Sequence, residues 1–167
     1  MARRRDPLRD ALRELELLHQ AGRSDAAVEQ LRAVMASEIG LQVAKAAAVA
    51  SAWSEGSLAP DLERSFYRLR GDGPAIDPQC WGKAAVIRAL FELAWDEPEI
   101  YVAGCRTVQL EPVRGGAEDT AAGVRRRSIR ALMQMPVVDA GRTSTALADL
   151  LADSDRSVRA EAAGVSV

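Results

Sequence analysis

The chain has 167 residues, of which 48% are hydrophobic and 28% charged, and its formal net charge is −2. This length suits one domain that buries roughly 70% of its unfolded surface. The 31 alanines and 17 leucines against 2 Phe, 2 Tyr and 3 Trp favour closely packed helices over a sheet-rich fold, because alanine is the least costly residue in a helix. One histidine and two cysteines exclude a histidine-rich or four-cysteine metal site. We therefore expect no metal, no cofactor and no catalytic residue.

The amino-terminal segment is basic but does not resemble a secretory signal. Its three arginines at positions 3–5 continue into Asp6-Pro7 without an apolar segment. No apolar run approaches the roughly 18 residues that would span a bilayer. The positive charge consists of 20 Arg and 2 Lys, which we attribute to genome composition. These features predict a cytoplasmic protein with neither a membrane nor a nucleic acid as its expected partner.

Helix starts are marked by an acidic or hydroxyl residue directly before an apolar segment. Asp6, Asp77 and Glu97 each precede a proline, and an acidic cap followed by proline at the first helical position is a typical N-terminus. Together with apolar residues at helical spacing, such signals predict helices that begin near Pro7, Ser24, Leu41, Leu58, Asp77, Pro98, Asp119, Thr143 and Ser154. Gly22 is expected to cap the first helix at its C-terminus, and Pro136 to end the seventh.

Short segments recur along the chain at a spacing of 34 to 42 residues. Lys-Ala-Ala at 45–47 recurs at 83–85, Ile-Arg-Ala-Leu at 87–90 recurs at 129–132, and Val-Arg at 124–125 recurs at 158–159. This spacing predicts stacked helix pairs. We expect one all-α domain over 1–167, a right-handed α-α superhelix (solenoid) of about four to five antiparallel helix pairs. Its expected parts are a capping pair at 1–37, repeats at 38–75, 76–117 and 118–153, and an incomplete repeat at 154–167.

Residues 150–163 (Leu-Leu-Ala-Asp-Ser-Asp-Arg-Ser-Val-Arg-Ala-Glu-Ala-Ala) resemble the HEAT-like repeat family, including the short form first described in phycobilin lyases. They share its pattern of a leucine-rich helix, an Asp-containing turn and then Val-Arg with small residues. The turn Asp can cap the next helix and contact the Arg one turn inside it. Residues 40–165 are also similar to uncharacterised bacterial HEAT-repeat proteins, with landmarks at 77–83 and 109–113. The first two helices fit a tetratricopeptide-like pair equally well.

Few residues suggest catalytic chemistry. His19 follows Leu18 on a leucine-rich helix, and we interpret it as a surface or half-buried side chain rather than a general base. A helix N-terminus can lower the pKa of a thiol such as Cys80, but beside Trp81 this residue is expected to be a small packed side chain. Cys105 is interpreted in the same way.

The segment 109–119 is not explained by helix stacking. It is long, polar and glycine-containing, as loops that bind partners often are, and it makes Gln109, Glu111, Arg114 and Asp119 candidate partner-binding residues. The alternative is a capping loop that closes the groove between two helix pairs, with Asp119 as a plain N-cap. Both interpretations stay open.

Two further surfaces are candidates for binding. Residues 125–127 and Arg130 place four arginines within two helical turns, which suits a phosphate or an acidic partner, although Glu118 and Asp119 upstream favour a solvated face. The family resemblance implies that the second helix of each pair lines the concave surface. With the expected repeats, that surface contains Glu29, Arg32, Glu63, Arg64, Tyr67 and Asp149, and we select Arg64 and Tyr67 as candidate contacts.

The sequence therefore predicts a non-enzymatic scaffold that binds a protein or peptide through the concave face or the 109–119 loop. An enzyme of the phycobilin-lyase repeat type is one alternative. A nucleic-acid-binding HEAT-like protein, as in DNA repair glycosylases, is another, since Trp53, Trp81 and Trp95 are available, but the net charge of −2 disfavours it. The apolar helix face at 158–165 lacks a following helix, so we also expect a homo-oligomer through residues 155–167.

Overall fold

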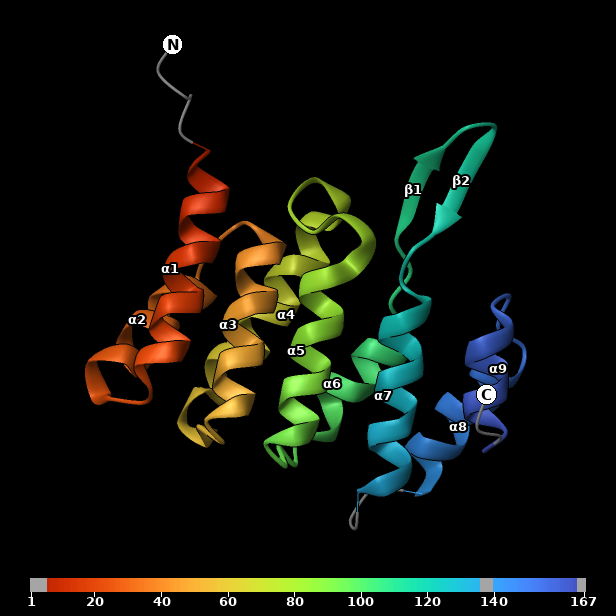
Figure 1. Ribbon diagram of the computed structural model, residues 1–167. Helices are drawn as coiled ribbons and strands as arrows, with labels where there is room; N and C mark the ends of the chain where they lie inside the picture. The colour runs from red at the N-terminus through yellow and green to blue at the C-terminus, as the bar shows by residue number, and fades with distance from the viewer. Residues whose placement is uncertain (1–5, 136–139, 165–167) are drawn as a thin grey trace.

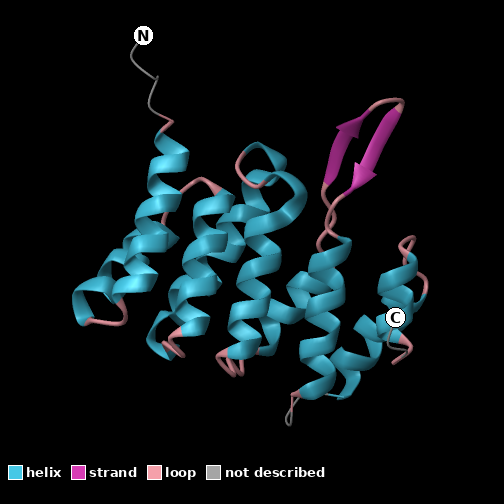
Figure 2. Ribbon diagram, viewed as in Figure 1, coloured by secondary structure: helices cyan, strands magenta, loops and turns pink. Residues whose placement is uncertain are grey.

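The computed structural model describes residues 6–135 and 140–164, and most of them are helical (Figures 1 and 2). The α-helices are α1 (Pro7–Ala21), α2 (Asp25–Met35), α3 (Gly40–Ala52), α4 (Ala59–Asp72), α5 (Trp81–Glu92), α6 (Pro98–Cys105), α7 (Ala122–Gln134), α8 (Ala140–Leu151) and α9 (Arg156–Ala162). Short 3₁₀ turns lie at Gly56–Leu58, Gly73–Ala75 and Pro78–Cys80, and the strands β1 (Leu110–Val113) and β2 (Gly116–Asp119) form a hairpin. No helix in the described part of the chain is long and apolar enough to cross a membrane.

The helices form two rows. In Figure 1, α1, α3, α5, α7 and α9 lie side by side, and we call them the odd row; α2, α4, α6 and α8 lie behind them and form the even row. Each helix of the odd row contacts the next one. The approach of α3 to α5 depends on glycine, because a Cβ on Gly82 would lie 2.8 Å from the carbonyl oxygen of Gly40. Glycine therefore sets the spacing between α3 and α5.

The helices pair in a different phase from the one expected. Contacts are extensive between α2 and α3, α4 and α5, α6 and α7, and α8 and α9, and they are fewer between α3 and α4 or between α7 and α8. The boundaries 38–75, 76–117 and 118–153 instead join α3 with α4, α5 with α6, and α7 with α8. Each close pair thus runs from an even helix to the next odd one, and α9 is the second helix of a pair with α8.

Three N-caps and one C-cap are confirmed. The Asp6 carboxylate accepts hydrogen bonds from the amides that begin α1, Ser24 does so for α2, and Asp155 accepts from the amides of Ser157 and Val158 at the start of α9. Gly22 ends α1 with φ at +87°, in the left-handed region that glycine tolerates. Local sequence therefore determines these ends.

Two other helix starts differ in detail. Helix α5 begins at Trp81, not at Pro78, because a 3₁₀ turn is inserted in which Gln79 and Cys80 have positive φ. The Asp77 carboxylate still caps α5 by accepting from the amides of Gly82 (2.7 Å) and Lys83 (3.0 Å). Helix α6 begins at Pro98 as expected, but the Glu97 side chain makes no capping hydrogen bond. The expected stop at Pro136 lies outside the described residues.

The segment expected as a loop at 109–119 is a β-hairpin that projects from the helices (Figure 2). Leu110 pairs with Asp119 and Val113 with Gly116, leaving Arg114 and Gly115 as a two-residue turn. Gly115 has φ at +97°, which such turns require. The sequence signal is this glycine together with apolar residues at every second position, 108, 110 and 112.

The apolar face of α9 points into the protein. Val158 is fully buried and Ala162 is 7% exposed, where α9 contacts α7 and α8. Val165 lies outside the described residues. Self-association through 155–167 stays a prediction, but Val158 and Ala162 do not supply an exposed apolar surface for it.

Candidate functional site

A buried ion pair holds the turn between α4 and α5. Lys83 and Asp77, 1% and 0% exposed, form an ion pair of 2.9 Å, and the Lys83 ammonium also donates to the Leu69 carbonyl at 3.1 Å. The sequence signal is an acid six residues before a cation. Such a pair is costly to break from one side, because the remaining charge is buried without a partner.

The same spacing recurs at Asp119 and Arg125. Arg125, 4% exposed, donates to Asp119 (2.6 Å), to the Thr107 carbonyl (2.9 Å) and to Asp153 (2.7 and 3.0 Å). Asp153 lies six residues before Arg159, whose guanidinium donates to the Asp153 carbonyl at 2.7 Å. Although burial alone would lower the pKa of Arg125, its hydrogen bonds to Asp153 and Asp119 raise it. This arginine therefore joins the hairpin and the pair α6–α7 to the pair α8–α9 and belongs to the framework.

The hairpin base is fastened to the start of α5. The Glu111 carboxylate accepts hydrogen bonds from the Gln79 amide (2.6 Å), from Gln109 Nε2 (2.7 Å) and from the Thr120 hydroxyl (2.7 Å). Gln109 Nε2 also donates to the Asp77 carbonyl at 2.9 Å. Burial would raise the pKa of Glu111, but the hydrogen bonds from Thr120, Gln109 and Gln79 outweigh it and lower that pKa. Gln109 and Glu111 are buried, and their side chains hydrogen-bond within the protein rather than facing a partner.

Asp119 also makes hydrogen bonds at the base of the hairpin, whereas Arg114 lies at the opposite end, in the turn. One Asp119 oxygen accepts from the amides of Gln109 and Ala121, both at 3.0 Å, and the other from Arg125. Helix α7 has Ala121 as its N-cap, so Asp119 is not a plain N-cap. Burial opposes ionisation of Asp119, but these hydrogen bonds lower its pKa. Arg114 lies exposed at the hairpin turn.

A basic cleft of about 290 Å³ lies between α5 and α7. We call it the odd-row cleft, and its lining residues are Ile87, Arg88, Phe91, Glu92, Arg126, Arg127 and Arg130. Two of its four arginines form ion pairs with an acidic side chain. Arg88 Nε lies 3.4 Å from Glu92 Oε1, and Arg130 Nε lies 2.7 Å from Glu161 Oε1. Of Glu118 and Asp119, expected to balance the arginines at 125–127 and Arg130, Asp119 pairs with Arg125. Neither acid forms an ion pair with Arg126, Arg127 or Arg130 among the described residues.

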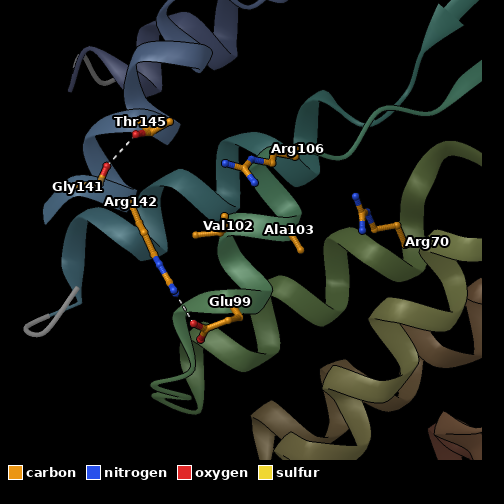
Figure 3. Close-up of a pocket in the computed structure, with 8 residues that line it drawn as sticks. All are labelled: Arg70, Glu99, Val102, Ala103, Arg106, Gly141, Arg142 and Thr145. Atoms are coloured by element: carbon orange, nitrogen blue, oxygen red, sulfur yellow. Dashed lines mark hydrogen bonds and ion pairs between the residues drawn. The ribbon is translucent and has the colours of Figure 1, made fainter. Parts of the chain in front are cut away.

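A larger cleft of about 730 Å³ lies across the even row (Figure 3). We call it the even-row cleft, and its lining residues are Arg70, Glu99, Val102, Ala103, Arg106, Gly141, Arg142 and Thr145. Arg142 reaches to Glu99 and forms an ion pair, whereas Arg70 and Arg106 lie apart from it (Figure 3). The Glu99 amide and then Arg142 donate to this carboxylate and lower its pKa.

The other candidates for the concave surface lie on the even row and are not gathered into one site. Arg64 is exposed and pairs with Asp61, which also pairs with Arg32 of α2. Tyr67 is 41% exposed, and burial and then Glu63 raise its pKa. Glu63 accepts a hydrogen bond from Trp95. Glu29 pairs with Arg32, and Asp149 lines a separate cleft beside the hairpin base.

The side chains considered for catalysis lie apart. Burial raises the pKa of the Cys80 thiol, and it raises that of Cys105 to about 12, so both are packed thiols as interpreted. His19 is half-buried with its ring 6.4 Å from that of Trp53. Within residues 6–135 and 140–164 no group of three His, Cys, Asp or Glu side chains is placed to hold a metal ion. None of the three tryptophans lines the odd-row or the even-row cleft.

The comparisons with known proteins give no relative. No family model matches the chain, and no match is found among curated proteins or among solved structures.

Proposed function

We propose that this protein is a non-enzymatic HEAT-like repeat scaffold, an α-solenoid, that binds a protein or peptide on the exposed face of its odd row. The helix pairs and the acid-to-cation spacing of six residues support the HEAT-like assignment. Asp77 with Lys83 and Asp119 with Arg125 make the contacts that this spacing allows. In the third case the Arg159 guanidinium donates to the backbone carbonyl of Asp153 and not to its carboxylate.

The phase of the helix pairs supports the odd row as the binding face. The family resemblance implies that the second helix of each pair lines the concave surface. With the pairs α2–α3, α4–α5, α6–α7 and α8–α9, the second helices are α3, α5, α7 and α9. This phase moves the proposed binding face away from Arg64 and Tyr67, which lie on α4.

The observation that carries the proposal is that two grooves lie on this one face. The odd-row cleft is one of them. The other, of about 410 Å³, lies between α1 and α3 and is lined by Leu12, Glu16, Leu41, Ala44, Lys45 and Ala48. Alanine side chains let a partner backbone come close to the helices, so a peptide laid along the row would reach both grooves.

The hairpin is a second candidate surface for the same function. Val108, Leu110 and Val113 are 65%, 61% and 45% exposed on this projecting element. Leu110 and Val113 lie on opposite faces of the hairpin, because side chains alternate along a strand. Because Gln109 and Glu111 hold the base, the contacts proposed here are these apolar residues and Arg114 at the turn.

The test is to block each face of the protein separately. Ala48 and Ala85 are partly exposed on α3 and α5, and Val102 and Thr145 line the even-row cleft. The Ala48→Glu/Ala85→Glu variant should lose a binding partner captured from the native cell, while Val102→Glu/Thr145→Glu should keep it. Retention by the first variant and loss by the second would move the site to the even row. A partner that neither variant affects would contradict the odd row as the binding face.

A further inference from the structure

The odd-row cleft concentrates positive charge that the protein does not neutralise. In the part of the chain that the structure describes, no acidic side chain lies within ion-pair distance of Arg126 or Arg127. Both are half-buried, and the Arg127 guanidinium donates to the Gly123 carbonyl at 3.0 Å. Burial lowers the pKa of Arg127, and Arg126, Arg88 and Arg130 lower it further by like-charge repulsion. An anion in this cleft would relieve that repulsion.

The charge balance indicates what kind of anion fits. Arg88 and Arg130 each have a carboxylate partner, whereas Arg126 and Arg127 have none among the described residues. A single carboxylate would neutralise one of these two cations, and a phosphate monoester carries close to two negative charges at neutral pH. Guanidinium groups also match phosphate oxygens with paired N–H donors.

The cleft has the size and lining for one such group. Its volume of about 290 Å³ is small, and Ile87 and Phe91 line it beside the four arginines. These apolar side chains lower the local dielectric and so strengthen a charge-assisted hydrogen bond. In the even-row cleft, by contrast, Glu99 pairs with Arg142, and Arg70 and Arg106 are exposed and lie apart from each other (Figure 3). We infer that the odd-row cleft is a binding site for a phosphate monoester dianion, held by Arg126 and Arg127 with Arg88 and Arg130 beside them.

This site goes beyond the proposed function, because it needs no protein partner. The phosphate can be carried by a small molecule or by a phosphorylated side chain of a partner peptide. In the second case the peptide lies along the odd row, and the phosphate fixes its position at α5 and α7.

The test measures binding of inorganic phosphate to the purified protein by calorimetry at constant ionic strength, with chloride as the balancing anion. The wild type should bind phosphate, and Arg126→Gln/Arg127→Gln should bind it weaker by about tenfold for each arginine. The matched control is Arg70→Gln/Arg106→Gln in the even-row cleft. It removes the same net charge and should bind phosphate like the wild type.

Two results would overturn the inference. One is no phosphate binding by the wild type, and the other is an equal loss in both double variants, since that would mean general attraction to a basic surface. Circular dichroism checks that the variants are folded. Arg126→Lys/Arg127→Lys, which keeps the charge but not the planar donors, should retain intermediate affinity.

A set of short peptides distinguishes the sources of the phosphate. A phosphoserine peptide that binds more tightly than inorganic phosphate supports a phosphorylated partner, and equal affinity supports a small phosphorylated ligand. If the same peptide with glutamate in place of phosphoserine binds equally well, the requirement for a dianion is wrong. Because every arm uses the purified protein, its failure is separate from failure of the partner-capture experiment.

Discussion

Arg125 and its neighbours Arg126 and Arg127 are consecutive residues of α7, yet they occupy opposite environments. Arg125 is 4% exposed and neutralised by Asp119 and Asp153, which lie at the hairpin base and in the turn before α9. Arg126 and Arg127 lie in the odd-row cleft without an acidic partner among the described residues. One step along a helix rotates a side chain by about 100°, so a run of like charges is divided between the framework and the surface.

The difference shows how to separate a structural charge from a functional one. A buried charge with balanced partners stabilises the fold, and its removal leaves those partners unpaired. A clustered charge without partners costs stability through like-charge repulsion, and we propose an anion outside the chain as its counter-charge. Three substitutions test this distinction, and they run from the largest expected effect to the smallest.

Replacing Arg125 should have the largest effect. Arg125→Met leaves Asp119 and Asp153 without their counter-ion and should lower the free energy of unfolding by about 3–5 kcal/mol, measured by urea denaturation. Arg125→Lys keeps the charge but loses the paired hydrogen bonds to Asp153, so it should lie between that variant and the wild type. A loss below about 1 kcal/mol in the methionine variant would show that Arg125 is not part of the framework.

Glu111→Gln should have a smaller and pH-dependent effect. In the wild type, both carboxylate oxygens of Glu111 accept hydrogen bonds. The variant replaces one of these oxygens by an NH₂ group, which faces a donor and cannot accept from it, and this should cost about 1–3 kcal/mol at neutral pH. The pKa of Glu111 in the folded protein lies below its usual 4.5, so its stabilisation is fully present above pH 4.5 and is lost as the pH falls through that lowered value. The difference in melting temperature between the wild type and the variant should therefore shrink below pH 4.5. A constant difference would contradict the assignment to the carboxylate.

Arg126→Gln/Arg127→Gln should have the smallest effect on stability. We expect a change of less than about 0.5 kcal/mol, with a slight increase in stability at low salt because like-charge repulsion is relieved. Added salt should remove this increase, because it screens exposed charges. Melting curves at several salt concentrations measure it. A loss of stability comparable to that of Arg125→Met would mean that the two environments do not differ as described.

Several elements could be predicted because their signals are local. The N-caps Asp6, Ser24 and Asp155 act on amides two or three residues away, so the sequence alone contains both partners. The hairpin is harder to predict, because the apolar alternation at 108–112 is short and the segment is otherwise polar and glycine-containing like a loop. The start of α5 differs from the expected one because Gln79, in the turn at Pro78–Cys80, is held by Glu111, which lies 32 residues further on.

The candidate site was less predictable for the same reason. Gln109 and Glu111 are polar residues of the kind found in binding loops. Nothing nearby in sequence indicates that Glu111 accepts hydrogen bonds from Gln79 and Thr120 instead. The arginine run was visible, but not its division into one framework residue and two in the odd-row cleft.

The sequence by itself determined an alanine-rich, mostly helical chain, most of its helix ends and the recurrence of helices along it, because helix propensity, capping and periodicity act over a few residues. Only the tertiary structure decided which helices pair, which acid neutralises which arginine and which cations keep no partner among the described residues. Asp119 with Arg125 is the exception, because it follows the six-residue spacing that the sequence contains. Contacts such as Arg125 with Asp153 and Gln79 with Glu111 join residues 28 and 32 positions apart, and no local pattern determines them.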